Sequence, residues 1–316
     1  MPPPTSFDFD AAVKAPFRMQ PGLRRLQPGS RQLSALTPDS PAFAEKLAVL
    51  STAPDEALLR ADGFDPLPAL RALVEEAAIQ CPGVLEASAD GAFGLAIGWH
   101  VHWNGSALHG VPGAHERAGA CLVALPAAQR LAALLSLSLH EDLAIVDAVS
   151  ATLPWLAVCL PSHWAPRDKV GRSFAAVHGP VADNATLLAA GEHLVRLVCQ
   201  PQRWERFVWT ITPHAGLDRH PQRHATVSWA RLPGEIASQA HWRTEHQTFI
   251  PLPSLQQALF TIHVDVQPLV EAIATPEQAE SLHAALSTMS DAVLAYRGLG
   301  PARDPLLAWL AERAAA

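Results

Sequence analysis

The clearest structural signal in the chain is Ala258-Leu-Phe-Thr-Ile-His-Val-Asp-Val266, in which apolar and polar side chains largely alternate. Successive side chains of a β-strand point to opposite faces of a sheet, so this pattern predicts a half-buried strand. Its apolar face is expected to hold Ala258, Phe260, Ile262, Val264 and Val266. Its polar face is expected to hold Thr261, His263 and Asp265.

Five other short segments are rich in the β-branched and aromatic residues typical of strands. Consecutive short strands separated by turns that contain proline or glycine favour an antiparallel sheet. The predicted strands are residues 143–149, 153–160, 207–211, 226–229 and 242–250.

Helical signals lie on both sides of these strands. Ser40 and Asp65 each precede a proline, which predicts a capping side chain next to a proline at the first helical position. Thr275-Pro-Glu-Gln278 has the spacing of a capping box, followed by a helical pattern that runs to Gly298. Further helices are expected at residues 126–137, 168–178, 184–199 and from 304 onward.

Together these patterns predict an α+β fold in which helices flank a central antiparallel sheet. We expect four regions along the chain. They are an extended N-terminal arm (1–38), a mostly helical N-terminal region packed on the core (39–135), a sheet-containing core (136–270) and C-terminal helices (271–316).

Charge and hydropathy argue against several classes of partner. The chain has 23 basic and 30 acidic residues, a formal net charge of −7 and no basic cluster, so neither nucleic acid nor an anionic membrane is expected to bind. There is no run of 18 apolar residues, and the segment Met1-Pro-Pro-Pro-Thr-Ser6 lacks the charged and apolar parts of a secretory signal. We therefore expect a cytoplasmic protein.

The sulfur and imidazole side chains give different indications. Four cysteines, at wide spacing and without a CxxC pair, are expected to be small buried side chains rather than a zinc or iron–sulfur site. Fifteen histidines are more than packing requires, which prompts a search for a metal or cofactor. The cysteines are Cys81, Cys121, Cys159 and Cys199.

One histidine stands at the end of an apolar stripe. If residues 168–178 form a helix, Val170, Phe174 and His178 are four apart and share one face. A buried neutral imidazole must hydrogen-bond at both nitrogens or give one of them to a metal, and an apolar wall suits a porphyrin. An ordinary hydrogen-bonded core histidine and a metal ligand are both consistent with this pattern.

Other constellations give weaker signals. His100 and His102 would share one face of a strand, which could begin a metal site or leave exposed imidazoles. His214, His220 and His224 lie in a polar segment that is typical of a solvated loop. Ser162 precedes a histidine without a nucleophile-elbow motif, and the chain has no glycine-rich phosphate loop or dinucleotide fingerprint.

Seven separated blocks resemble, in order and spacing, the α-subunit family of heme-dependent oxidative N-demethylase. The resemblance covers about residues 140–268 well. The blocks are Glu141-Asp142-Leu143, Cys159-Leu-Pro161-Ser162-His-Trp164, Lys169-Val-Gly171, His178-Gly-Pro180-Val181, Arg206 with Trp209, Arg243-Thr-Glu245-His-Gln247-Thr248 and Leu259-Phe260-Thr261-Ile262.

The resemblance implies that residues 136–270 form a PAS-like domain that carries heme b. His178 would then be the proximal iron ligand, and Trp164 would belong to the cofactor site. Lys169 and Arg243 could pair with the heme propionates, or instead be a surface charge and a strand-edge ion pair. Glu245 could bind a cationic amine, or hold Arg243 in place, which is the role that its spacing favours.

Four positions depart from the polar residues that are common in the family. They are His140, Val208, His246 and His263. A contact of any of them with the propionates or the substrate would change the substrate or the catalytic competence while heme binding could persist.

The resemblance thus predicts a monooxygenase-type enzyme that uses O2 to remove a methyl group from a small secondary amine such as dimethylamine, with release of formaldehyde. Electrons would come from a partner reductase with FMN and an iron–sulfur cluster. Two alternatives remain. The chain could be a heme-binding PAS sensor without turnover, or a homologue that has lost heme and catalysis.

Overall fold

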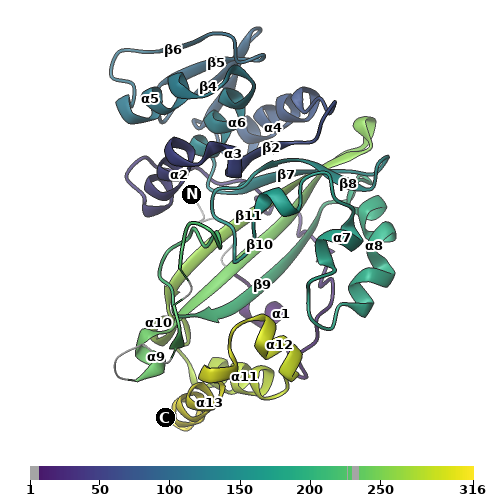
Figure 1. Ribbon diagram of the computed structural model, residues 1–316, viewed down its shortest axis with the longest axis vertical. Helices are drawn as coiled ribbons and strands as arrows, with labels where there is room; N and C mark the ends of the chain where they lie inside the picture. Colours follow the sequence, from purple (N-terminus) through teal and green to yellow (C-terminus); the bar gives the residue numbers. More distant parts are fainter. Residues whose placement is uncertain (1–6, 226, 230–234) are drawn as a thin grey trace.

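The computed structural model describes residues 7–225, 227–229 and 235–316. A seven-stranded antiparallel sheet forms its centre, with helices above, below and at one side (Figure 1). The strand order is β1-β9-β10-β11-β7-β8-β2. The strands are β1 Arg24–Arg25, β2 Leu58–Arg60, β7 Asp142–Asp147, β8 Thr152–Ala157, β9 Trp204–Thr212, β10 His241–Leu252 and β11 Gln257–Pro268.

Five of these strands come from the predicted core, in the order β8-β7-β11-β10-β9. Two helices, α7 (Phe174–His178) and α8 (Ala185–Val198), connect β8 to β9 and lie beside the sheet in Figure 1. The predicted α+β fold, with an antiparallel sheet and flanking helices, is confirmed. The domain boundaries at residues 38, 135 and 270 stay a prediction.

Strand β11 is more enclosed than its alternating pattern predicted. Thr261, expected on the polar face, is fully buried, and its hydroxyl lies 2.7 Å from that of Thr248. Gln32 of the N-terminal arm donates to the same Thr248 hydroxyl, at 2.9 Å. The arm and the N-terminal helices cover this face, so the prediction of a half-buried strand holds only toward Asp265, which is exposed.

The N-terminal arm is attached to the sheet at several points. Its β1 pairs with β9, and the short helix α1 (Phe9–Ala12) contacts the same strand. Ser34 donates through its backbone N–H and its hydroxyl to the carboxylate of Glu141, at 3.0 and 2.5 Å. These contacts hold part of this segment against the sheet, while an arm with the bounds 1–38 stays a prediction.

Residues 39–135 contain helices and also a second sheet that was not anticipated. Its four antiparallel strands are β3 Leu85–Ala87, β4 Gly91–Gly94, β5 Trp99–His102 and β6 Leu108–Gly110. The helices are α2 Pro41–Thr52, α3 Pro54–Ala57, α4 Leu67–Gln80, α5 Glu116–Ala124 and α6 Ala127–Ser138. Ser40 caps α2 as expected, whereas Pro66, not Asp65, is the residue before α4.

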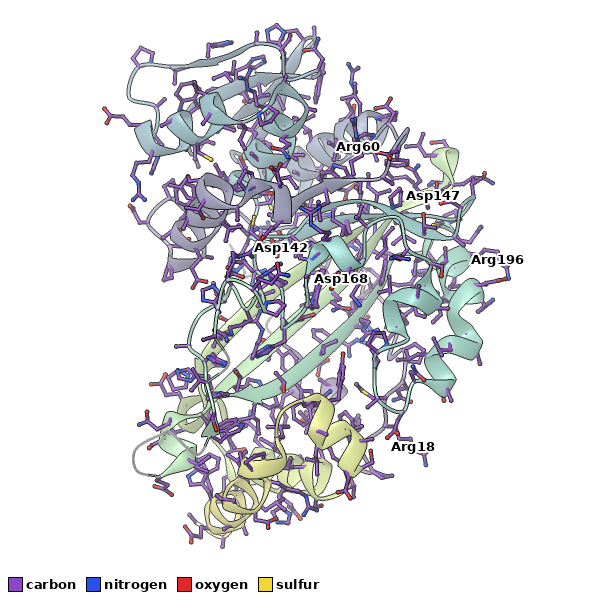
Figure 2. All side chains as sticks on the ribbon, in the orientation of Figure 1. Arg18, Arg60, Asp142, Asp147, Asp168 and Arg196 are labelled. Carbon is purple, nitrogen blue, oxygen red and sulfur yellow. The ribbon has the colours of Figure 1, made fainter. Side chains whose placement is uncertain are left out.

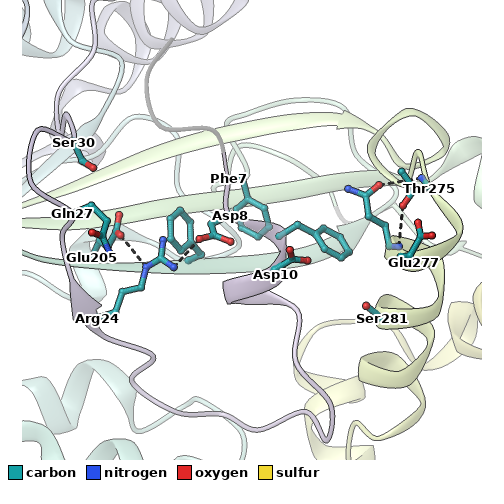
Figure 3. A pocket seen from close by; sticks show the side chains of 13 residues that line it. Phe7, Asp8, Asp10, Arg24, Gln27, Ser30, Glu205, Thr275, Glu277 and Ser281 are labelled. Carbon is teal, nitrogen blue, oxygen red and sulfur yellow. Dashed lines mark hydrogen bonds and ion pairs between the residues drawn. The ribbon is translucent and has the colours of Figure 1, made fainter. Parts of the chain in front are cut away.

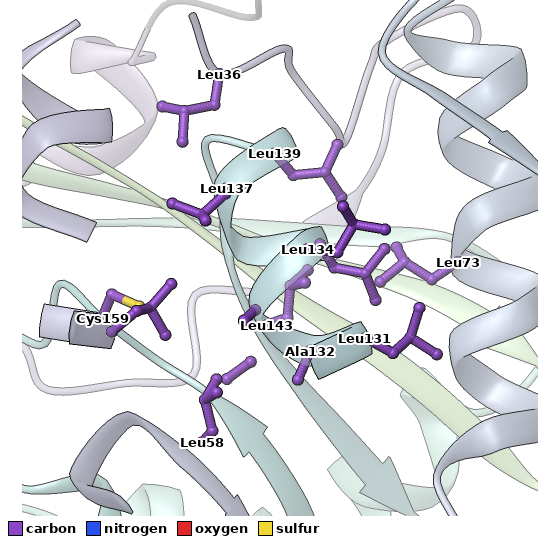
Figure 4. Close-up of a cluster of buried hydrophobic side chains, with 14 of the residues drawn as sticks. Leu36, Leu58, Leu73, Leu131, Ala132, Leu134, Leu137, Leu139, Leu143 and Cys159 are labelled. Atoms are coloured by element: carbon purple, nitrogen blue, oxygen red, sulfur yellow. The ribbon is translucent and has the colours of Figure 1, made fainter. Parts of the chain in front are cut away.

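The largest apolar cluster joins this region to the main sheet. Leucines of α4 and α6 meet side chains of β2 and β7 and the buried thiol of Cys159 (Figure 4). A charged pair crosses the same boundary: Lys46 of α2, fully buried, lies 3.3 Å from Asp142 of β7, which is interior in Figure 2. All four cysteines are free and buried, as predicted.

The C-terminal helices close the other end of the sheet. Thr275 and Gln278 form the predicted capping box, but the helix ends at Ser287 and does not continue to Gly298. Trp209 and Trp242, stacked with ring centroids 4.9 Å apart, belong to the cluster beneath these helices. The helices are α9 Ile236–Gln239, α10 Leu269–Ala272, α11 Pro276–Ser287, α12 Asp291–Tyr296 and α13 Arg303–Ala314.

Two further predictions need correction. Residues 168–178 are not one helix: a 3-10 turn, Pro166–Asp168, is separated from α7 by Gly171, whose φ of +69° interrupts helical geometry. The predicted strand 226–229 begins outside the described residues, and residues 227 and 228 have no regular structure. Among the helices that the structure describes, none is long and apolar enough to span a membrane.

Candidate functional site

Helix α7 is a single short turn of helix whose ends are held from outside. Ser173 caps its N-terminus by accepting from the backbone N–H of Ala176 at 3.3 Å. At the other end, Lys169 donates to the carbonyl of Val177 at 2.7 Å, and Asn184 donates to that of His178 at 3.1 Å. Because these donors satisfy carbonyls that a helix end leaves free, the position of His178 is well determined.

The ring of His178 is oriented by the turn before it. Its Nδ1 lies 2.9 Å from the carbonyl oxygen of Phe174, and the two rings stack at 4.0 Å. A carbonyl can only accept, so Nδ1 carries the proton and Nε2 keeps its lone pair. Nε2 has no hydrogen-bond partner in the described part of the chain. The same backbone bond orients metal-binding histidines in general.

Burial keeps this imidazole neutral. It lowers the pKa of His178 to about 4, the bond to Phe174 opposes the shift, and the nearby cations Arg206 and Lys169 add to it. A neutral imidazole with a free Nε2 is the form that binds iron.

Helix α8 supports α7 through a glycine. A Cβ atom at Gly191 would lie 2.8 Å from Cδ1 of Phe174, closer than such atoms approach. The absent side chain therefore lets Phe174 lie against α8, where it joins an apolar cluster with Phe249 and Phe260 of the sheet. This packing sets the distance between His178 and the sheet.

The sheet face on this side carries a mixed set of side chains. Neighbouring residues in antiparallel register point the same way, and Arg206 is paired with Gln247 and Val208 with Glu245. Phe260 and Phe249 are likewise paired on this face. We call this surface of β9, β10 and β11 the α7 face.

Trp164 and Lys169 lie on the same side. Trp164 packs with Val170 and Phe260 in an apolar cluster on the α7 face, and its assignment to the cofactor site stays a prediction. Lys169 and Arg206 are both partly buried, and burial lowers the pKa of each. Arg206 makes no hydrogen bond or ion pair with the described residues, so its guanidinium is available to an anion. Arg206 belongs to one of the seven blocks that resemble the family, but no role was predicted for it from the sequence.

Arg243 points to the same face of β10 as Glu245, two residues away, but is engaged inside the protein. Its side chain is almost fully buried, and its nitrogens donate to the carbonyls of Leu160, Gly216 and Leu217 and to the hydroxyl of Ser162. Most of its donors are thus bonded to two internal loops, which argues against the predicted propionate contact, although that contact stays a prediction. The described residues give Arg243 no ion pair, so the strand-edge ion pair considered as the alternative is not found.

Ser162 links this cation to Glu245. Its hydroxyl accepts from Nε of Arg243 at 2.7 Å and donates to Oε1 of Glu245. Gln247 donates to the other carboxylate oxygen at 2.5 Å. The expected partnership of Glu245 and Arg243 is thus indirect, through the serine. Lone pairs remain on the carboxylate for a further donor.

Three of the four departures lie on the opposite face. His263 pairs with His246 in register, and its ring stacks on that of His140 at 3.9 Å. His263 also contacts Glu141 at 2.9 Å, and His246 contacts Glu205 at 2.8 Å. Only Val208 shares the α7 face with Glu245, so it is the departure placed to affect a ligand there.

The competing constellations do not form a metal centre. Among the described residues, no group of three or more histidine, cysteine or carboxylate side chains could hold a metal ion. His100 and His102 lie on a strand, as one interpretation required, and both approach Asp90, at 3.5 and 3.3 Å. The prediction that His214, His220 and His224 lie in a solvated loop is in part wrong, because His214 and His220 are buried.

A cavity of about 590 Å³ lies on the other side of the sheet, between the arm, β9 and α11 (Figure 3). Arg24 crosses it to meet Asp8 and Glu205, at 2.7 and 2.9 Å. Because Glu205 is on the face opposite to Glu245, this cavity is distinct from the surroundings of His178.

Residues 115–307 match the family model described as haem-dependent oxidative N-demethylase, alpha subunit-like. The matched segment is more than half of the 316 residues and includes α7, α8 and the five core strands.

Proposed function

This chain belongs to the haem-dependent oxidative N-demethylase, alpha subunit-like family, and we propose that it binds heme b through His178 and demethylates a small secondary amine. The observation that carries the proposal is the ring of His178, with Nδ1 held by a backbone carbonyl and Nε2 free of any described partner. This is the arrangement that a proximal histidine needs.

The residues around His178 suit a porphyrin. Apolar side chains of the α7 face, such as Phe260 and Trp164, can contact a flat macrocycle. Lys169 and Arg206 act on the pKa of His178 as nearby cations, which supports them as propionate partners. We therefore retain Lys169 and replace Arg243 by Arg206 as the second propionate partner.

Glu245 is the proposed amine-binding residue. A protonated secondary amine carries a positive charge and N–H donors, which a carboxylate accepts. Ser162 and Gln247 hold the carboxylate so that its orientation is set before the substrate arrives. Val208, beside it in register, would contact the alkyl substituents.

Bound heme would supply a reducible iron for oxygen activation. For dimethylamine the balance is (CH3)2NH + O2 + 2 e− + 2 H+ → CH3NH2 + HCHO + H2O. The electrons must come from another protein. The alpha-subunit description implies a partner subunit, and we propose a reductase with FMN and an iron–sulfur cluster.

Absorbance spectroscopy tests the heme site. Protein from heme-supplemented cells is expected to show a Soret band, and His178→Ala is expected to lose it or shift it. Gly179→Ala is a matched control, because an added Cβ there meets nothing closer than 3.4 Å. Identical spectra for wild type and His178→Ala would remove the ligand assignment.

Formaldehyde release from dimethylamine, with an artificial electron donor, tests the reaction. A Soret band without formaldehyde would favour the sensor alternative. Absence of heme under all conditions would favour a homologue that has lost the cofactor.

A further inference from the structure

The loop between β9 and β10 holds a buried cation that no carboxylate pairs with directly. Arg219 is 6% exposed, and within the described ranges it has no ion pair shorter than 4.0 Å. The segments outside those ranges, residues 1–6, 226 and 230–234, contain no aspartate or glutamate. A missing carboxylate of this chain therefore cannot be its partner.

Part of the guanidinium has no acceptor among the described residues. Nη2 donates to Nε2 of His214 at 2.9 Å and to the carbonyl of Ala225 at 3.4 Å. Nε is buried and has no partner in the described part of the chain, and Nη1 donates to no described residue. A buried cationic donor without an acceptor is costly, typically about 1–3 kcal/mol or more. Such a group therefore points to a ligand.

Two imidazoles border this guanidinium. His214 is buried, and since an arginine can only donate, its Nε2 must be the unprotonated acceptor. His163 is exposed, with its ring centroid 5.7 Å from that of His214. Its φ of +62° is uncommon for a residue with a Cβ atom. The preceding residue, Ser162, forms a β-bridge with Arg219, which places the exposed His163 beside Arg219.

The nearby acids are committed elsewhere. Glu45 accepts from the backbone N–H groups of Leu217 and Asp218, at 3.1 and 2.7 Å. Asp218 accepts from Arg223 at 2.8 Å and contacts His224 at 3.0 Å. The charges of Asp218 and Glu45 raise the pKa of Arg219, but burial has the larger, opposite effect. Arg243, also buried, adds positive charge nearby.

We propose that Arg219, His214 and His163 form a binding site for a small oxyanion, a carboxylate or a phosphate. A guanidinium presents parallel N–H donors that match two oxygens of either group. The imidazole of His163 would contribute a third donor from the solvent side. Neither the family match nor the assignment of His178 is needed for this site.

Titration calorimetry with inorganic phosphate and with acetate, at constant ionic strength in chloride, tests the proposal on the full chain. Saturable binding of at least one of them, absent for chloride, is expected. Arg219→Gln should weaken it by at least about ten-fold, the loss expected for one charge-assisted contact. The anion that binds with the higher affinity identifies the class of oxyanion.

The matched control is Arg196→Gln, since Arg196 projects from α8 into solvent (Figure 2) and should bind the anion as wild type does. If Arg219→Gln fails to fold, His163→Ala serves instead, because removing an exposed side chain leaves the fold intact. This variant is expected to bind the anion roughly three- to ten-fold more weakly than wild type. Wild type that binds neither anion above chloride, or a folded Arg219→Gln that binds as wild type does, would overturn the proposal.

Discussion

Ser162 shows how one hydroxyl can join a structural cation to a proposed binding carboxylate. It accepts from Arg243 and donates to Glu245, so the two charges act on each other through an oriented dipole. Arg243 fixes the loops at residues 160–162 and 216–217, while Glu245 faces the space near Arg206. On the same strand, Arg243 therefore has a structural role and Glu245 is left for the proposed binding role.

Glu245→Gln tests the amine-binding role. The neutral amide loses the charge that attracts an ammonium ion, so KM for dimethylamine should rise at least about ten-fold, equal to about 1.4 kcal/mol. The Soret band should be unchanged. Formaldehyde release at varied amine concentration measures the effect.

Ser162→Ala is the control for that variant, because it breaks the link to Arg243 and keeps the carboxylate. Its KM should change less than that of Glu245→Gln. An equal rise in both variants would assign Glu245 to structure alone.

Arg243→Met should destabilise the fold. Three loop carbonyls, those of Leu160, Gly216 and Leu217, would lose their donor, and each unsatisfied buried group costs about 1–3 kcal/mol. We expect the free energy of unfolding to fall by roughly 3 kcal/mol in urea titrations. A loss below about 0.5 kcal/mol, the usual range for exposed sites, would contradict the structural role.

At the scale of elements, the pair α7 and α8 sets where His178 stands. Phe174 is the contact between them. Its ring stacks on that of His178 and lies against Gly191, and its carbonyl oxygen accepts a hydrogen bond from Nδ1–H of His178. A shift of this side chain would therefore move the proximal ligand.

Gly191→Ala measures that coupling. Helix propensity alone favours alanine by about 1 kcal/mol, whereas the added Cβ would meet Phe174 at 2.8 Å. We expect weaker heme retention and a free energy of unfolding lowered by about 1–3 kcal/mol. Denaturation and heme-transfer assays provide both values. A more stable variant with unchanged heme binding would show that the Phe174 side chain can shift without lowering the stability or moving His178.

On the scale of the whole molecule, buried histidines tie stability to pH. Burial lowers the pKa of His140 and of His214 to about 4, with further lowering by His263 and by Arg219 respectively. Unfolded histidines titrate near 6.5. Between about pH 4 and 6.5 the unfolded chain thus binds more protons, so stability falls as the pH falls through this window.

His140→Gln should reduce that pH dependence. Between pH 6.5 and pH 5, each of these histidines lowers the free energy of unfolding by roughly 1–2 kcal/mol. Glutamine does not titrate, so the variant lacks this contribution. Urea unfolding of the heme-free protein at the two pH values should show a smaller difference for the variant. Parallel pH profiles for variant and wild type would assign the acid sensitivity to other groups, such as His214 and His178, whose pKa values burial also lowers to about 4.

Most of the fold was predictable because its signals are local. Alternation identified β11, and proline and cap residues identified α2 and α11. The seven blocks between about residues 140 and 268 that resemble the family led to the prediction for His178. The second sheet, β3–β6, was missed because its strands are three or four residues long, too short for a clear period.

What the amino-acid order determined by itself was therefore the α+β class and most strands and helices; it also supplied the proposal of His178 as the iron ligand. Only the tertiary structure decided that Arg243 is internal, that Arg206 lies near His178, that three of the four departures face away, and that Arg219 is buried. Periodicity reports which residues share a face of one element. Register between strands and the course of long loops decide which distant side chains meet, and these depend on contacts that no short window of sequence contains.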